Sequence, residues 1–263
     1  MELTVPALIF DCDGVLADTE RFGHLPAFNQ TFAEFGVPVR WSDSDYAEKV
    51  LIGGGKERMA SLLTPEFLAK TGLPAEPAEQ QAMVADWHRR KGAIYAELVN
   101  EGRMPARPGI KRLVEEALAD GFTLAVASTS AESSVRAVLV HVVGEQLANR
   151  FRVFAGDIVA AKKPAPDIYE LTLAELGFGP EDAIVIEDSE NGLRAAAAAG
   201  IRTIVTVSSY TANEDFYAAA LVVSCLGDPA GEEAIVLAAP GGVRPDHHVT
   251  ASDLRALLTV PTQ

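Results

Sequence analysis

Short apolar runs alternate along most of this chain with longer segments of helical periodicity, and this alternation constrains the fold more than any other feature. Six apolar runs are predicted strands, at residues 7–10, 122–127, 153–155, 183–186, 202–207 and 221–223. Helical patterns lie between them, at residues 110–120, 131–147, 166–176 and 192–199. Apolar strands that alternate with helices are typical of a parallel sheet buried on both faces. We therefore predict an α/β fold, a Rossmann-like parallel sheet core with helices on both faces.

Residues 21–100 interrupt the alternation, because helical patterns follow one another there without a convincing strand. These patterns cover residues 26–35, 45–50, 56–63, 65–71 and 78–100. The Pro- and Gly-containing stretch at 105–109 would return the chain to the sheet. The sequence thus predicts a Rossmann-like catalytic core made of residues 1–20 and 101–263, with a small helical cap domain inserted at 21–100. The tail at 227–263 is rich in Gly and Pro and ends in a short helical pattern at 252–258, to which we assign no role.

The composition restricts the classes of partner and compartment. Hydrophobic residues make up 48% of the 263 residues, which is enough to bury a sizeable core. The 22 Lys and Arg residues against 37 Asp and Glu residues give a net charge of −15, which disfavours nucleic acid and anionic membranes as partners. Two cysteines, Cys12 and Cys225, do not form a disulfide framework. No apolar run reaches about 18 residues, and no signal peptide is visible, so we expect a cytoplasmic monomer.

Polar residues stand where the predicted strands end. Ligands of open parallel sheets bind at the carboxyl ends of the strands, so these side chains are expected to share a crevice. Several carboxylates in one crevice repel one another unless a cation offsets their charge, and Mg²⁺ usually serves where the substrate carries phosphate. The pattern therefore predicts metal-assisted chemistry on an anionic group. The strand-end residues expected to converge, if their strands are neighbours, are Asp11, Asp13, Ser128, Glu187 and Asp188. Asp157 ends a further strand, and Lys163 follows it as a source of positive charge.

Four short motifs resemble those of the haloacid dehalogenase-like superfamily, in its order and with similar spacing. The first motif of that superfamily, Asp-x-Asp-Gly-(Thr/Val), is similar to residues 11–15, and the second to Ser128 at a strand end. The third is similar to Lys163-Pro164-x-Pro166, and the fourth to Glu187-Asp188-Ser189-x-x-Gly192. One Asp-x-Asp alone is a weak signal, but four motifs that each follow a predicted strand are a strong one.

The resemblance implies a role for each motif residue. Asp11 would be the nucleophile that forms an aspartyl phosphate, and Asp13 would act as the general acid and then the general base. Ser128 and Lys163 would hold the phosphoryl oxygens. The resemblance also implies Mg²⁺ bound by Asp11, the Asp13 carbonyl, Asp188 and, directly or through water, Glu187. From the residues alone, Thr129 and Ser130 compete with Ser128, and Lys162 competes with Lys163. We interpret Cys12 as a core residue, because its side chain should point to the opposite face of the strand.

The inserted helices resemble the small cap of the β-phosphoglucomutase-like branch. Within this branch, the cap resembles that of CbbY-type phosphatases, which act on xylulose-1,5-bisphosphate, because it contains Gly-Gly-Lys-Glu-Arg-Met followed by His-Arg-Arg-Lys. The resemblance implies a small phosphorylated sugar as substrate. The substrate-binding residues it implies are Glu20, His24, Gly54, Gly55, Lys56, Arg58, Lys91, Ser128, Thr129 and Lys163. The chain departs from the pattern by one extra residue before His24, so that Gly23 stands where the family usually has His. Gly53–Lys56 is not a P-loop, because Glu57 stands where Ser or Thr is required.

The resemblance leaves three functional hypotheses. The first is a Mg²⁺-dependent sugar-phosphate phosphatase, the second a mutase on the same scaffold, and the third a non-catalytic binding protein. The intact set of motif residues disfavours the third. The cap carries a cluster of Lys56, Arg58, Arg89, Arg90 and Lys91 in an otherwise acidic chain, which favours a substrate with a second anionic group. The alternative for these cations is a solvated helix surface.

Overall fold

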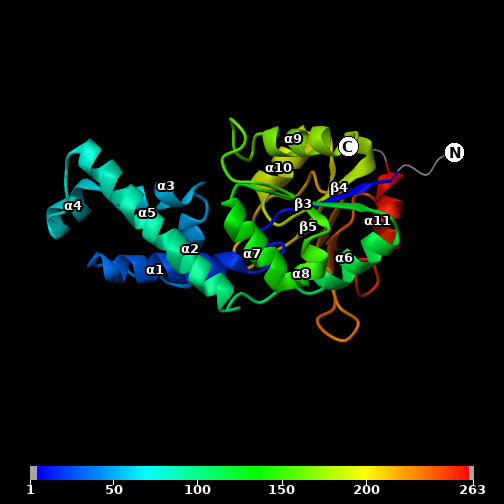
Figure 1. Cartoon of the computed structure of the whole chain (residues 1–263), viewed down its shortest axis with the longest axis horizontal. Coiled ribbons are helices and arrows are strands. Elements are labelled where there is room, and N and C mark those ends of the chain that lie inside the picture. The colour runs from blue at the N-terminus through cyan, green and yellow to red at the C-terminus, as the bar shows by residue number, and fades with distance from the viewer. Residues whose placement is uncertain (1–4, 261–263) are drawn as a thin grey trace. The chain divides into compact units, whose positions relative to one another are not determined.

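The computed structural model describes residues 5–260 and divides the chain into two compact units (Figure 1). One unit consists of Met1–Asp18 and Pro105–Gln263, and the other of Thr19–Met104. The first contains the sheet and the second contains helices. None of the helices in the described chain is both long and apolar enough to cross a membrane.

A seven-stranded sheet organises the first unit, with the strand order β3-β2-β1-β4-β5-β6-β7. Every neighbouring pair is parallel except the last, in which β7 runs antiparallel to β6. The chain moves from β1 outward to β3 and then returns to the other side of β1 with β4, so the carboxyl ends of β1, β2 and β4 are adjacent. The strands are Ala7–Phe10 (β1), Thr123–Ser128 (β2), Phe151–Ala155 (β3), Ala183–Glu187 (β4), Arg202–Thr206 (β5), Leu221–Val223 (β6) and Val236–Ala238 (β7).

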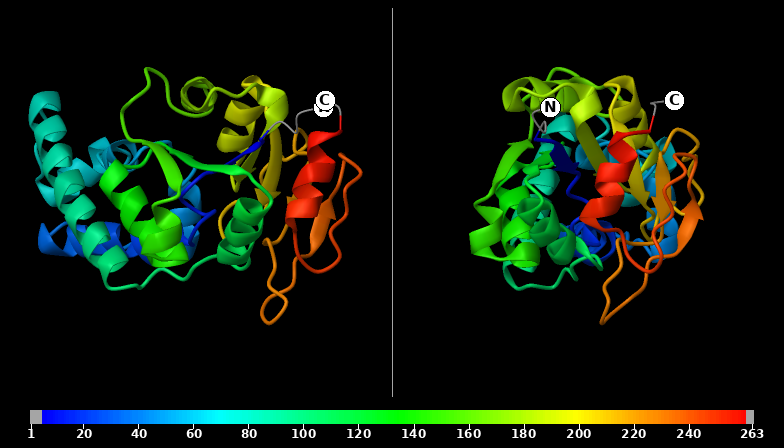
Figure 2. Two further views of the ribbon diagram at one scale, coloured as in Figure 1. Left: turned by 45° about the vertical axis from the view of Figure 1, so that its right-hand side comes forward. Right: turned by 90° about the vertical axis from the view of Figure 1, so that its right-hand side faces the viewer.

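Helices cover both faces of this sheet, as predicted (Figures 1 and 2). On one face, alternate strand residues such as Ile9, Ala125 and Val185 pack with Ile168 and Ala195 of the helices in a single buried cluster. Since β1, β2 and β4 are buried along their whole length or nearly so, each carries apolar residues on both faces. The helices of this unit are Ile110–Ala119 (α6), Glu132–Val143 (α7), Glu145–Ala148 (α8), Asp167–Leu176 (α9), Glu190–Ala198 (α10) and Ala251–Leu258 (α11), with a 3-10 turn at Pro180–Asp182.

Two predicted elements of the first unit differ in the structure. The single helix predicted over 131–147 is two helices, because Gly144 has a φ of 86° and ends α7 there. The tail contains β7, which the sequence pattern did not reveal, since the strand is only three residues long and lies at the sheet edge. Arg112 of α6 holds the tail through hydrogen bonds to the backbone carbonyls of Leu226, Gly227 and Val249.

The second unit is built from helices around an aromatic core. Ring contacts join Phe28, Phe32, Trp41, Tyr46 and Trp87. The α-helices are Leu25–Glu34 (α1), Asp43–Lys49 (α2), Gly55–Ala60 (α3), Pro65–Thr71 (α4) and Pro77–Asn100 (α5). The unit opens with one element that was not predicted, a π-helix at Glu20–His24.

Candidate active site

The carboxyl ends of three adjacent strands place the core motifs together. Asp11 directly follows β1 and is tied to β4 by a hydrogen bond from its backbone N–H to the carbonyl of Ile186, 2.9 Å long. Glu187 is the last residue of β4, and Asp188 follows it. Ser128 is the last residue of β2, so it lies inside the strand that was predicted to end one residue earlier. The parallel register of β1 with both β2 and β4 therefore brings these side chains to one edge of the sheet.

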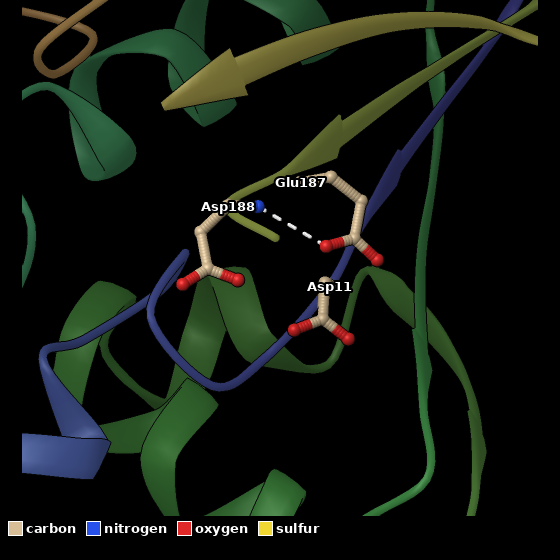
Figure 3. Close-up of side chains that lie close together, drawn as sticks. All are labelled: Asp11, Glu187 and Asp188. Atoms are coloured by element: carbon tan, nitrogen blue, oxygen red, sulfur yellow. Dashed lines mark hydrogen bonds between the residues drawn. The ribbon is translucent and has the colours of Figure 1, made fainter. Parts of the chain in front are cut away.

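Three carboxylates form a buried cluster at this edge (Figure 3). Asp11, Glu187 and Asp188 each offer an oxygen, and these oxygens lie within 4.8 Å of one another. The three residues are 8%, 1% and 7% exposed, respectively. A set of oxygen donors with this charge fits a hard divalent cation such as Mg²⁺.

Lys163 supplies the positive charge within the cluster. Its Nζ donates to Asp11 Oδ1 and to Glu187 Oε1, both at 2.6 Å, and to the carbonyl oxygen of Ala127 at 3.1 Å. Burial by itself lowers the pKa of the Lys163 ammonium, but Asp11 and Glu187 more than offset this and raise the pKa well above its usual range. Lys162, the alternative, instead forms an exposed ion pair with Asp157 at 2.8 Å.

The nucleophile candidate lies in a strongly negative environment. The pKa of the Asp11 carboxyl is raised to about 7, mainly by burial; Lys163 lowers it, and the charges of Glu187 and Asp13 raise it. Lys163 thus does not offset the combined effect of burial and the neighbouring carboxylates. A bound cation would remove this penalty and keep Asp11 ionised.

Two motif glycines, Gly14 and Gly192, lie so close to the carboxylates of Asp188 and Glu187 that a side chain at either position would clash with them. A Cβ at Gly14 would lie 2.1 Å from Asp188 Oδ2, and Gly14 also has a φ of 78°. A Cβ at Gly192, in the first turn of α10, would lie 2.0 Å from the Glu187 carboxyl carbon. The glycines of the first and fourth motifs therefore allow the backbone to approach the cluster closely.

Asp13 and the turn after β2 form a second group at the site. The Ser130 hydroxyl donates a hydrogen bond to Asp13 Oδ2. The backbone N–H of Ser130 donates to Ser128 Oγ at 3.2 Å. Thr129 is half-buried between them. Ser128 is 2% exposed, and its neighbour Ser130 contacts the proposed acid–base residue directly.

Tyr169, in the first turn of α9, is a member of the site that the sequence analysis missed. Its hydroxyl donates to Glu187 Oε1 at 2.6 Å, and its side chain is fully buried. The sequence signal was a tyrosine on the face of α9 that otherwise buries Ile168 and Leu173. A buried tyrosine hydroxyl needs a hydrogen-bond partner, but the periodicity does not say which one.

In the second unit, Arg58 is bound by the unit itself. Its Nη1 donates to Glu20 at 3.1 Å and to the Tyr46 hydroxyl at 2.7 Å. Its Nε and Nη2 donate to the carbonyl oxygens of Ile52 and Val50. The Arg58 and Glu20 side chains are 12% and 17% exposed. Arg58 and Glu20, both predicted to bind substrate, thus bind each other.

The π-helix explains the extra residue before His24. Gly23 is buried, and a Cβ there would lie 2.5 Å from Met104 Cε and 2.8 Å from Tyr95 Cε2, so a larger residue does not fit. His24 stacks on the Tyr95 ring, with 4.3 Å between centroids, and its Nδ1 lies 2.5 Å from Lys91 Nζ. A π-turn holds one residue more than an α-turn, and here it brings the histidine, displaced by one position, next to Lys91.

Lys91 and Lys56 place positive charge near His88 in this unit. Lys91 is 7% exposed, and its Nζ lies 4.8 Å from the Phe28 ring centroid. Burial, with the charges of Lys91 and Lys56, lowers the pKa of His88 to about 4, so its ring is neutral at neutral pH. Lys56 is exposed, and no ion pair of Lys56 is found within residues 5–260.

The glycines that precede Lys56 allow two side chains to approach. A Cβ at Gly54, which has a φ of 94°, would lie 2.1 Å from Glu57 Oε2. A Cβ at Gly55 would lie 2.9 Å from His88 Nε2.

Comparison with known proteins identifies the family. Residues 5–200 match the family described as haloacid dehalogenase-like hydrolase. The chain belongs to this family. It is therefore an enzyme, a phosphatase of the CbbY type, as relatives at 41–44% identity indicate.

Two relatives illustrate the similarity. A CBBY-like protein of Arabidopsis thaliana is 44% identical over 234 residues, which are 87% of this chain and 72% of that protein. Protein CbbY of Cereibacter sphaeroides is 41% identical over 237 residues, which are 90% of this chain and 99% of that protein.

Solved structures agree with the sequence relatives. The crystal structure of CbbY from Rhodobacter sphaeroides in complex with phosphate superposes with a TM-score of 0.73 at 41% identity, and covers 84% of this chain and 95% of that one. A mutant of the same protein in complex with xylulose-1,5-bisphosphate superposes with a TM-score of 0.72 over the same shares. These comparisons confirm the predicted fold class and family.

Proposed function

We propose that this chain is a Mg²⁺-dependent phosphatase that hydrolyses a sugar phosphate through an aspartyl-phosphate intermediate, with xylulose-1,5-bisphosphate as the substrate. The observation that carries the proposal is the contact of Asp11 with Lys163 inside a buried group of carboxylates at the end of β1. The bound xylulose-1,5-bisphosphate in a relative of 41% identity supports the choice of substrate.

Asp11 and Asp13 carry the proposed chemistry. A carboxylate oxygen of Asp11 attacks phosphorus and forms an acyl phosphate while the sugar alkoxide leaves. Asp13 protonates that alkoxide and then takes a proton from the water that attacks the acyl phosphate, which releases inorganic phosphate and restores Asp11. Ser128 and Lys163 hold the phosphoryl oxygens during both steps.

Asp11, Glu187 and Asp188, with the Asp13 carbonyl, are proposed to hold the Mg²⁺. The three carboxylates fit this ion because their oxygens converge within 4.8 Å and Lys163 offsets only part of their charge. When bound, Mg²⁺ supplies positive charge that offsets the charge of the reacting phosphoryl group.

We propose that the Thr19–Met104 unit is the cap domain and that it selects the substrate. Lys56 and Lys91, with His24, are proposed to bind the second phosphate, and Gly54 and Gly55 to shape the loop before Lys56. Arg58 holds Glu20, and we propose that this pair contributes to substrate binding by presenting the Glu20 carboxylate to sugar hydroxyls. Thr129 is proposed to line the phosphate site beside Ser128.

Phosphate release from a panel of sugar monophosphates and bisphosphates tests this proposal. We expect the highest kcat/KM for xylulose-1,5-bisphosphate, with no requirement for a bisphosphate activator. Conversion of a sugar monophosphate to its isomer without phosphate release would instead support the mutase. No turnover of any member of the panel in the presence of Mg²⁺ would contradict both.

A further inference from the structure

Tyr169 contacts both members of the ion pair beside the proposed nucleophile. Its hydroxyl donates to Glu187 Oε1, and its ring centroid lies 4.8 Å from Lys163 Nζ. Glu187 Oε1 thus accepts two hydrogen bonds of 2.6 Å, one from Tyr169 and one from Lys163. The buried Tyr169 side chain therefore contacts both the carboxylate of Glu187 and the ammonium group of Lys163.

The two oxygens of Glu187 have different surroundings. Oε1 faces Tyr169 and Lys163, whereas Oε2 accepts a hydrogen bond of 3.1 Å from the backbone N–H of Asp188. Figure 3 shows the Glu187 carboxylate beside Asp11 and Asp188. Donors on both oxygens restrict rotation of the carboxylate, and of these donors only the tyrosine hydroxyl belongs to a rigid ring packed in the core.

Packing alone does not explain why the ring carries a hydroxyl. Tyr169 lies in a core cluster with Ile168, Leu173 and Phe154, where a phenylalanine would fill nearly the same volume. Because the Glu187 carboxylate can only accept, the 2.6 Å contact makes the phenol hydroxyl the donor.

We propose that Tyr169 is a positioning residue whose hydroxyl fixes the orientation of the Glu187 carboxylate, and thereby the position of Lys163 against Asp11. The inference rests on the proposed function, because Glu187 and Lys163 act there on the metal and the phosphoryl group. Groups that orient metal ligands typically change activity or metal affinity by about 10–100-fold when they are removed.

A double-mutant cycle with Glu187 tests the proposal. Tyr169→Phe removes one oxygen and keeps the ring over Lys163. We expect kcat for p-nitrophenyl phosphate at saturating Mg²⁺ to fall about tenfold, with KM within about twofold. In the Glu187→Ala background the same exchange should change kcat by less than about twofold, because no acceptor is left for the hydroxyl to orient.

The Mg²⁺ dissociation constant, measured by calorimetry without substrate, gives a second readout of the same cycle. It should rise in Tyr169→Phe relative to the wild type and be unchanged between Glu187→Ala and the double variant. This readout completes the cycle even where the Glu187→Ala variants turn over too slowly to measure. Tyr217→Phe, at a position that is 82% exposed, is the matched control and should match the wild type in every measurement.

Two results would overturn the proposal. One is a Tyr169→Phe variant that equals the wild type in kcat and in Mg²⁺ affinity. The other is a loss of equal size in the wild-type and Glu187→Ala backgrounds, which would mean that Tyr169 acts through packing. Failure of the proposed function has a different signature, since wild-type protein would then release no phosphate while the calorimetric cycle still reports on Tyr169.

Discussion

The charged groups of the two units are held in different ways. In the sheet unit, carboxylates gather at adjacent strand ends, and Asp11, Glu187 and Asp188 converge although 176 positions separate the first from the second. In the helical unit, most of the cations that are clustered in the sequence form ion pairs with nearby carboxylates. Arg58 pairs with Glu20, Arg90 with Glu34, and Arg89 with Asp86.

This difference shows that a charge pattern in the sequence predicts a binding site more reliably at strand ends than on helix surfaces. A residue at the end of a parallel strand has its position set by backbone register, so its neighbours follow from the fold. A cation on a helix surface binds whichever acidic group lies within reach, and this chain is rich in acidic groups. Five clustered cations therefore do not amount to five ligands for a substrate.

Replacing the proposed nucleophile of the sheet unit should lower kcat more than any other exchange. A small effect would contradict the view that the strand ends form the catalytic site. Asp11→Asn is nearly isosteric but cannot form an acyl phosphate, so kcat should fall by at least about a thousandfold with an unchanged circular dichroism spectrum. Asp157→Asn is the matched control, because the Asp157 side chain also follows a strand but is 86% exposed. Substantial activity in Asp11→Asn would remove Asp11 as the nucleophile.

Removing the metal should come next. Chelation of Mg²⁺ is expected to abolish phosphate release, and Asp188→Ala to reduce it by about a hundredfold, because the remaining carboxylates then repel the anionic substrate. Ca²⁺ should inhibit, since its larger and looser coordination misplaces the reacting oxygens. Full turnover in excess chelator would contradict the metal assignment.

Arg58→Ala should affect the helical unit as a whole. The exchange leaves the largely buried Glu20 carboxylate without its cation, which should lower the free energy of unfolding by about 3 kcal/mol. Both tryptophans, Trp41 and Trp87, lie in this unit, so their fluorescence during urea unfolding reports its stability directly. We expect kcat/KM to fall for bisphosphates and monophosphates alike. A stable variant impaired only toward bisphosphates would show instead that Arg58 binds the second phosphate.

Lys56→Ala should have the smallest and most selective effect. Lys56 is exposed and not paired in the described chain, so its loss should leave stability unchanged. The kcat/KM for xylulose-1,5-bisphosphate should fall about tenfold, and that for p-nitrophenyl phosphate should change little. Lys70→Ala, at an exposed position of α4, is the control. Equal losses for both substrates would argue against a second-phosphate site at Lys56.

The sequence alone determined the α/β class, the inserted helical segment, and the Asp11, Ser128, Lys163 and Glu187-Asp188 positions. It did so because uninterrupted apolar runs, helix-ending glycines and polar strand ends are local properties that recur regularly in a parallel sheet. The same regularity places Cys12 in the core, 1% exposed.

Only the tertiary structure decided which side chains are partners. Tyr169 meets Glu187 because α9 packs against the sheet face that carries Ala125 of β2 and Val185 of β4, and nothing in the periodicity of α9 specifies that contact. The pairing of Arg58 with Glu20 joins residues 38 positions apart, and Gly23 is required by Met104 and Tyr95 from the far end of the unit. Such contacts depend on how whole elements pack, because the side chain that reaches a given group is set by three-dimensional distance and not by spacing along the chain.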